Sequence, residues 1–210
     1  GDQSSTFDAL QDSISAGLSA GISGIPFWGW DLAGFTGDFP TAELYKRSTQ
    51  AAAFAPIMQF HSEKANPSPS EERSPWNVQE RTGDDTIIPT FRYYVNTRMN
   101  ILPYIYSEYM KAALRDGMYC MPLAFAFPDD DFARQVEDEV MIGESLLIAP
   151  VYEQNARGRY VYLPEEMLQV RVKCSENDRM ETTVLPAGHH YIPVELDEVV
   201  FFVRKGHILP

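Results

Sequence analysis

The chain has 210 residues, 44% of them hydrophobic and 12% aromatic, and can therefore bury a sizeable core as one large domain or two small ones. Its formal net charge of −13 argues against nucleic acid and anionic membrane surfaces as partners, and no apolar run reaches the roughly 18 residues that a transmembrane helix requires. The two cysteines stand in no CxxC or Cys/His spacing, which suggests neither a disulfide framework nor a zinc site and, with the acidic charge, favours a cytoplasmic location.

The N-terminal part alternates between helical and strand patterns. A capping pattern followed by apolar residues at helical spacing predicts a helix over residues 5–20. A short apolar run predicts a buried strand at 25–28, and a second helix and a second strand are expected at 41–53 and 57–60. Helices and strands that alternate with short connections are typical of a parallel α/β unit.

The segment 62–85 is rich in Pro, Ser, Glu and Asn and lacks an apolar period, which predicts a long loop. Loops of this length inside a compact domain are usually functional or mobile. Arg73 and Trp76 are the loop residues expected to face a ligand, with a solvated surface as the alternative. A long amphipathic helix is expected over residues 91–114, with a bend at Pro103.

The chain beyond Pro122 has the pattern of an all-β region. Short apolar or alternating runs, separated by Pro, Gly and Asn/Asp turns, predict strands at 146–151, 159–163, 170–174 and 199–203. The boundary between the two parts is expected between residues 117 and 132. The run Asp129-Asp130-Asp131 lacks the ligand spacing of a calcium loop and is expected to cap a helix.

The segment Trp28–Phe35 has the composition of a sugar site, with two tryptophans, one carboxylate and a glycine-bracketed turn. Aromatic rings cover the apolar faces of a pyranose, and a carboxylate accepts hydroxyl protons through charge-assisted hydrogen bonds. Asp31 and His61 each follow a strand-like segment, and Asp2 belongs to a Gly-Asp pair that would follow a strand. The alternation would gather them at the carboxyl edge of one parallel sheet, where the chemistry lies in a (β/α)8 barrel.

Each of these residues also has a plainer structural interpretation. Asp2 can cap the helix that starts after a Ser-Ser pair, and Asp31 can be a turn former. A single histidine after an apolar strand, such as His61, is often a satisfied structural residue. Trp28 and Trp30 are as typical of a core as of a ligand wall.

A series of motifs follows in order along the chain: Gly1-Asp2-Gln3-Ser4-Ser5, Gly24-Ile25-Pro26-Phe27, Gly29-Trp30-Asp31-Leu32-Ala33-Gly34-Phe35, Glu43-Leu44-Tyr45, Ala55-Pro56-Ile57-Met58 with His61, Leu102-Pro103-Tyr104-Ile105-Tyr106, Pro122-Leu123-Ala124-Phe125-Ala126-Phe127-Pro128, Gly143-Glu144-Ser145-Leu146-Leu147-Ile148-Ala149-Pro150-Val151 and Phe202-Val203-Arg204-Lys205-Gly206-His207-Ile208-Leu209-Pro210. Together they resemble glycoside hydrolase family 31, the family of α-glucosidases and α-xylosidases. The resemblance implies the C-terminal portion of a (β/α)8 TIM barrel over residues 1–124, from after strand 6 through helix 8. Part of an all-β sandwich domain would follow over residues 125–210.

The resemblance also implies retaining, exo-acting hydrolysis of terminal α-linked glucose from α-glucoside oligosaccharides by two carboxylates, without a metal or another cofactor. Asp2 matches the family's acid/base position. Asp31 and His61 match positions that line the subsite for the non-reducing sugar, and Phe35 matches its aromatic wall. Trp28 and Trp30 join these substrate-binding residues because of the local sugar-site pattern.

The family's nucleophile lies in a Trp-Asp-Met-Asn type of segment, and these 210 residues contain none. The chain alone is therefore expected to be an inactive fragment that requires the remainder of the catalytic domain, from upstream sequence or from a partner chain. Alternatives within the family are an α-xylosidase and an α-transglucosylase. A non-catalytic carbohydrate-binding homologue is an alternative of another class, whereas a dehydrogenase or phosphatase lacks support because no GxGxxG turn or phosphate loop occurs.

Overall fold

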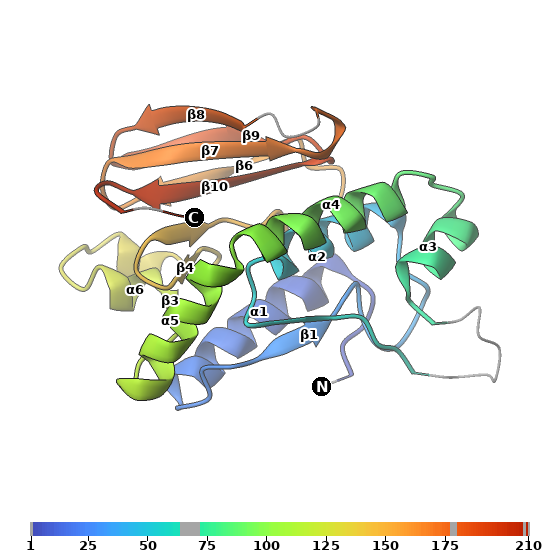
Figure 1. The fold of residues 1–210 in the computed structure, drawn as a ribbon, viewed down its shortest axis with the longest axis horizontal. Helices are drawn as coiled ribbons and strands as arrows, with labels where there is room; N and C mark the ends of the chain where they lie inside the picture. The colour runs from blue at the N-terminus through green and yellow to red at the C-terminus, as the bar shows by residue number, and fades with distance from the viewer. Residues whose placement is uncertain (1, 64–71, 177–179, 208, 210) are drawn as a thin grey trace.

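The computed structural model of the chain describes residues 2–63, 72–176, 180–207 and 209. Helices of the N-terminal half lie together, and the strands drawn in orange and red form a layer above them (Figure 1). The first elements are the helix α1 (Phe7–Ile22), the strand β1 (Gly29–Asp31), the helix α2 (Ala42–Ala52) and the strand β2 (Ile57–Gln59). β1 and β2 pair in parallel, which confirms the predicted α/β unit.

Side-chain caps fix where these two helices begin. The hydroxyl oxygen of Thr6 accepts a hydrogen bond from the backbone N–H of Ala9 at 3.1 Å, so α1 starts one residue later than a cap at Ser5 would place it. Thr41 caps α2 in the same way by accepting from the N–H of Leu44 at 3.2 Å.

The first strand lies at Gly29–Asp31, and the prediction of a strand at 25–28 is wrong. Gly29 pairs with Ile57, and a Cβ atom at Gly29 would lie 2.6 Å from the carbonyl oxygen of Ile57. The absence of a side chain at Gly29 therefore lets the two backbones approach. The prediction placed the strand on the residues before Gly29 because they are more apolar. In the structure Ile25 and Phe27 are exposed.

Three helices follow: α3 (Pro75–Thr82), α4 (Ile87–Asn100) and α5 (Leu102–Leu114). The first corrects the prediction of a loop throughout 62–85, because Ser74 caps α3 and Pro75 occupies its first turn. The long helix expected over 91–114 is two helices that meet at Ile101. Pro103, which has no N–H, lies in the first turn of α5 and starts a new helix instead of bending one. No helix in the described part of the chain combines the length and apolarity needed to cross a membrane.

The C-terminal half contains the all-β region that the sequence predicts. Its elements are the strand β3 (Cys120–Pro122), the short helix α6 (Leu123–Ala126), and the strands β4 (Val140–Ile142), β5 (Leu146–Ile148), β6 (Gly158–Leu163), β7 (Met167–Lys173), β8 (Met180–Leu185), β9 (Gly188–Pro193) and β10 (Glu198–Arg204). Six strands form an antiparallel sheet in the order β3-β4-β5-β10-β7-β8, and β6 and β9 form a second, antiparallel pair. The Asp130 carboxylate accepts from the N–H groups of Phe132 and Ala133, where a 3-10 helix (Ala133–Gln135) begins, as the Asp129–Asp131 run predicts.

The two halves pack against each other through a shared core. Phe54, at the end of α2, contacts Phe201 of β10 with ring centroids 5.5 Å apart. Arg47 of α2 is buried and donates to the carbonyl oxygens of Val194 and Glu195 at 3.3 and 2.9 Å. The helices of the first half and the sandwich are therefore held together by apolar packing and by hydrogen bonds to the backbone. The division at residues 124 and 125 stays a prediction.

Candidate active site

Residues 2–5 run alongside the turn that follows β1, where Ser4 forms an isolated parallel bridge with Thr36. The carbonyl oxygen of Gln3 accepts from the N–H groups of Phe35 and Thr36 at 2.8 and 3.1 Å. The Gln3 side chain donates from Nε2 to the carbonyl oxygen of Asp31 at 2.9 Å. Asp2 is exposed. Its carbonyl oxygen accepts a hydrogen bond from Oγ1 of Thr36 at 3.3 Å, which holds its backbone next to the turn after β1.

The turn after β1 can adopt this position because of Gly34. Ala33 and Gly34 have φ angles of 58° and 103°. A Cβ atom at Gly34 would lie 2.6 Å from Oγ and 2.7 Å from N and Cα of Ser5. The contact between residues 2–5 and this turn therefore requires glycine, both for its φ angle and for the close approach of the two backbones.

Asp31 and Gln59 lie opposite each other at the carboxyl ends of β1 and β2. The carboxylate Oδ1 of Asp31 accepts from Nε2 of Gln59 at 2.8 Å, which orients the carboxylate and leaves acceptor capacity for a ligand. The rings of Phe35 and His61 lie nearby, with centroids 5.3 Å apart and an interplanar angle of 51°. The structure thus brings Asp31, Phe35 and His61 to one edge, next to the backbone of residues 2–5.

Trp28 and Trp30 do not join this group. Trp30 is only 6% exposed, and its indole N–H donates to the hydroxyl of Ser48 in α2 at 3.0 Å. Trp28 is half-buried, with its ring directly on Gly17 of α1. Both side chains therefore pack β1 against helices, and the structure gives no support to the expectation that they contact a sugar.

Arg73, expected to face a ligand, is instead 5% exposed. Its Nη2 donates to the carbonyl oxygens of Thr36, Gly37 and Asp38 at 3.0, 2.9 and 3.2 Å, so it holds the loop directly after Phe35. Burial lowers the pKa of this guanidinium, and the nearby carboxylate of Glu63 partly offsets the effect. Trp76 is 61% exposed, and its ring meets the edge of Phe60 at 6.3 Å.

Sequence reasoning missed Gln59, which donates to the Asp31 carboxylate, and Gln3, which donates to the Asp31 backbone carbonyl. One signal was available for Gln59: it ends an apolar strand two residues before His61, as Asp31 ends the strand before it. Within the residues that the structure describes, no three His, Cys, Asp or Glu side chains are grouped as metal ligands. The arrangement of carboxylates, an imidazole and an aromatic face can hold a neutral, polyhydroxylated ring by hydrogen bonds and stacking.

Two family models match the chain. The glycosyl hydrolases family 31 TIM-barrel domain matches residues 1–108, and the glycosyl hydrolase family 31 C-terminal domain matches residues 116–209. An isomaltosyltransferase from Sporosarcina globispora is 48% identical over all of this chain, which covers 19% of that protein. A 1,3-alpha-isomaltosidase from Kribbella flavida is 42% identical over 78% of this chain and 23% of its own length.

Solved structures of related enzymes also match the chain over its whole length or nearly so. The cycloalternan-forming enzyme from Listeria monocytogenes, in complex with a pentasaccharide substrate, is 48% identical, with a TM-score of 0.91 over 100% of this chain and 19% of that one. The cycloalternan-degrading enzyme from Trueperella pyogenes, in complex with cycloalternan, is 34% identical with a TM-score of 0.88 over 99% and 28% of the two chains. This chain spans about a fifth to a quarter of the length of the relatives it matches.

Proposed function

Because the chain belongs to glycoside hydrolase family 31, as a portion of its TIM barrel followed by its C-terminal domain, we propose that it takes part in retaining cleavage of an α-glycosidic bond. Asp2 is the proposed acid/base residue. The observation that supports this proposal is the pairing of residues 2–5 with the turn after β1, in which Gln3, directly after Asp2, hydrogen-bonds to the backbone of Asp31 and Phe35.

In the retaining mechanism one carboxylate attacks the anomeric carbon while a second, about 5–5.5 Å away, protonates the leaving oxygen. Asp2 would supply that proton and later take one from water or from an acceptor hydroxyl. Asp31 and His61 would bind hydroxyl groups of the sugar, and the ring of Phe35 would cover its apolar face.

We propose that the attacking carboxylate comes from outside these 210 residues, in the same polypeptide or in a partner chain. The Trp-Asp-Met-Asn type of segment that carries it in the family does not occur here. The chain alone is accordingly expected to be inactive. If no such segment is found in the complete protein, the non-catalytic carbohydrate-binding alternative gains support.

The proposed substrates are α-glucoside oligosaccharides. The α-glucosidase relatives support release of a terminal glucose but are only 28–32% identical. The isomaltosyltransferase and the 1,3-alpha-isomaltosidase are 48% and 42% identical. The higher identity favours a second candidate function, in which the unit transferred or released is isomaltosyl.

The role of Asp2 is tested with Asp2→Asn in a protein that contains the complete catalytic domain. Loss of a general acid and base slows turnover of an α-linked disaccharide by roughly 10²–10⁴-fold. Turnover of α-glucosyl fluoride, whose leaving group needs no proton, falls much less and rises again when azide replaces water as the second nucleophile. Asp8→Asn, at an exposed aspartate of α1, is the matched control and keeps full activity. Equal loss on both substrates, without azide rescue, would contradict the assignment.

A further inference from the structure

The outer face of the β6–β9 pair carries a group of aromatic rings that the candidate active site does not use. Tyr160 lies directly opposite Tyr191, and Tyr162 lies opposite His189. The ring centroids of these pairs are 5.3 and 4.8 Å apart. Phe132 completes the group, 5.5 Å from His189 and 5.7 Å from Tyr162. We call these five residues the aromatic platform.

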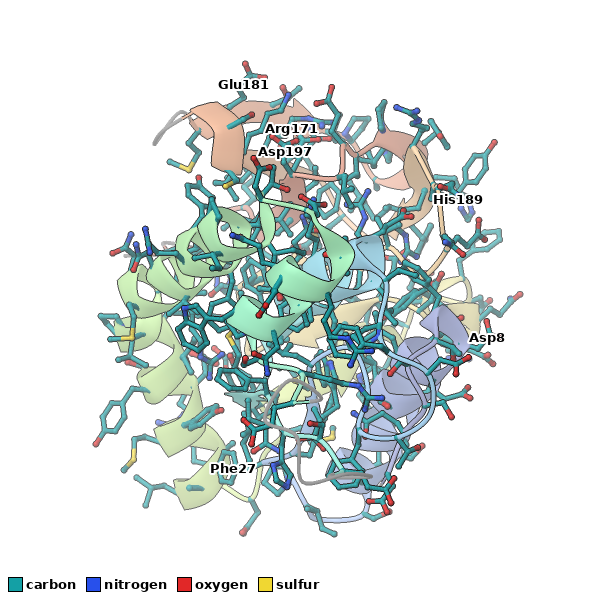
Figure 2. All side chains as sticks on the ribbon, turned by 90° about the vertical axis from the view of Figure 1, so that its right-hand side faces the viewer. Asp8, Phe27, Arg171, Glu181, His189 and Asp197 are labelled. Atoms are coloured by element: carbon teal, nitrogen blue, oxygen red, sulfur yellow. The ribbon has the colours of Figure 1, made fainter. Side chains whose placement is uncertain are left out.

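The platform is a surface feature. Val161, Leu163 and Ile192 point from the same two strands into the sandwich core, so the intervening side chains face outward. The outward face of such a pair is ordinarily polar. Tyr160 is 74% exposed, and Tyr191 is 53% exposed. Figure 2 shows His189 at the outer edge of the molecule, on the same side as Asp8 of α1.

Hydrogen-bonding groups surround the platform. A cavity of about 500 Å³ adjoins Tyr160 and Tyr191, and Gln11 of α1, Asp138, Glu153 and Arg159 also line it. The hydroxyl of Tyr152, another lining residue, is buried and has no hydrogen-bond partner among the described residues. On the opposite side of the platform, the Asp130 carboxylate accepts from the hydroxyl of Tyr162 at 2.7 Å.

The charges at the cavity suit a neutral ligand. Arg159 forms an ion pair with Asp138, with Nη2 and Oδ2 2.6 Å apart. The other two charged lining residues, Glu153 and Arg157, have opposite charges, so the lining carries no net charge that would select an ion. Carboxylates and amides beside exposed rings can hydrogen-bond the equatorial hydroxyls of a sugar while a ring covers its apolar C–H face. A volume of several hundred Å³ is that of a small-molecule site.

We propose that the aromatic platform and its adjoining cavity bind an α-glucan chain, as a second sugar site on the sandwich. The choice of α-glucan among neutral sugars rests on the proposed function. Gln11 connects the cavity to α1, the helix that follows Asp2, so a glucan held here lies on the side of the molecule where the candidate active site begins. The platform would raise the local concentration of substrate without taking part in the chemistry.

The test is affinity electrophoresis of the complete protein through gels with and without dextran, a soluble α-1,6-glucan. The double variant Tyr160→Ala and Tyr191→Ala is expected to weaken retardation at least fivefold, because stacking on exposed rings is lost. Tyr160→Phe with Tyr191→Phe keeps the rings and is expected to keep most of the retardation. Tyr106→Ala, at a 63% exposed tyrosine of α5, is the matched control and leaves retardation unchanged.

Asp31→Ala separates this proposal from the proposed function, because it disables the candidate active site and leaves the platform intact. Retardation that persists in Asp31→Ala and weakens at least fivefold in the alanine double variant supports the platform, whatever the activity assays give. Unchanged retardation in the double variant would overturn the proposal, as would loss of retardation in Asp31→Ala alone. Absence of dextran retardation in the parent protein would also overturn the proposal. If the double variant then differs from the parent in oligomeric state by gel filtration, the platform is a contact between protein chains instead. Melting temperatures of all variants exclude unfolding as the cause.

Discussion

The side chain of Gln3 donates a hydrogen bond from Nε2 to the backbone carbonyl oxygen of Asp31 at 2.9 Å. Gln3 directly follows the candidate acid/base residue Asp2, and Asp31 carries the carboxylate proposed to hold the sugar. One side-chain amide therefore connects the segment of the proposed acid/base residue to the backbone of the proposed sugar-binding residue. The same residue accepts from the N–H of Phe35 through its backbone, so the aromatic wall is tied to the same point.

Gln3→Leu tests this connection. Leucine has a similar size but donates no hydrogen bond, so the turn after β1 loses its side-chain hydrogen bond to Gln3 and keeps only the backbone ones. We expect kcat/KM on an α-glucoside to fall about tenfold, which corresponds to about 1.4 kcal/mol. Gln154→Leu, at an exposed loop glutamine, is the control and keeps kcat/KM. Equal kcat/KM for the parent and Gln3→Leu would show that the hydrogen bond does not position the site.

Gly34→Ala and Gly37→Ala form a matched pair for the close approach of residues 2–5. Both glycines have positive φ angles, of 103° and 76°, so alanine strains the backbone at either position. A Cβ atom at Gly34 would also lie 2.6 Å from Oγ of Ser5, whereas a Cβ atom at Gly37 would have no other atom of the described residues within 4 Å. We expect Gly37→Ala to lower the free energy of unfolding by about 1–2 kcal/mol. Gly34→Ala should lower it by about 1–3 kcal/mol more, measured by urea denaturation. Equal losses would contradict the crowding argument.

Arg73→Lys tests whether the loop after Phe35 depends on one guanidinium. A lysine side chain ends one atom short of Nη2, the single nitrogen that contacts all three carbonyl oxygens, so its ammonium cannot reach the three of them. We expect KM to rise several-fold with a smaller change in kcat, because the aromatic wall loses its support, and the free energy of unfolding to fall by about 1–3 kcal/mol. Arg92→Lys, on the exposed side of α4, should change neither quantity. A loss of stability without any change in KM would limit Arg73 to a structural role.

The order of helices and strands was predictable from periodicity, but the register of the first strand was not. Hydrophobicity identifies residues that prefer burial, and it does not identify the residue that must lack a side chain. Gly29 sets the start of β1 because the carbonyl oxygen of Ile57 occupies the space of its Cβ atom. The register then decides that Trp30 faces Ser48 in the core. The sequence assigned Trp28 and Trp30 to the same sugar site as Asp31, but both side chains pack against helices instead.

The meeting of Asp31 and His61 at one edge was predictable because polar groups at the ends of parallel strands lie together, whereas the assignment of Asp2 stays a prediction. Arg73 was assigned to a ligand because its surroundings have the composition of a loop. Its acceptors are backbone carbonyls more than thirty positions earlier in the chain. The composition of a short sequence segment cannot predict so distant a hydrogen-bond partner. The aromatic platform was missed for a related reason, since Tyr160 and Tyr191 become neighbours only through strand pairing.

Glu139 is the residue from which we expect the clearest pH dependence of stability. It is 2% exposed, and its Oε1 accepts from the N–H of Tyr162 at 2.7 Å, while Oε2 is buried without a hydrogen-bond partner among the described residues. Burial raises the pKa of this carboxyl to about 8, and the N–H of Tyr162 and the charge of Arg159 offset only part of the effect. The folded protein therefore holds a proton here that the unfolded chain releases near pH 4.5.

The sign of the effect follows from that difference. Because the pKa is higher in the folded state, the stability linked to this proton is fully present below about pH 4.5 and is lost as the pH rises through about 8. Glu139→Gln imitates the protonated carboxyl at every pH. We expect it to leave the melting temperature nearly unchanged at pH 5 and to raise the free energy of unfolding by about 1–3 kcal/mol at pH 8.5. Glu137→Gln, two residues away and exposed, is the control and should follow the parent protein at both pH values. Parallel pH profiles for the parent and Glu139→Gln would mean that the carboxylate reaches water on ionising, and that its burial does not destabilise the sandwich.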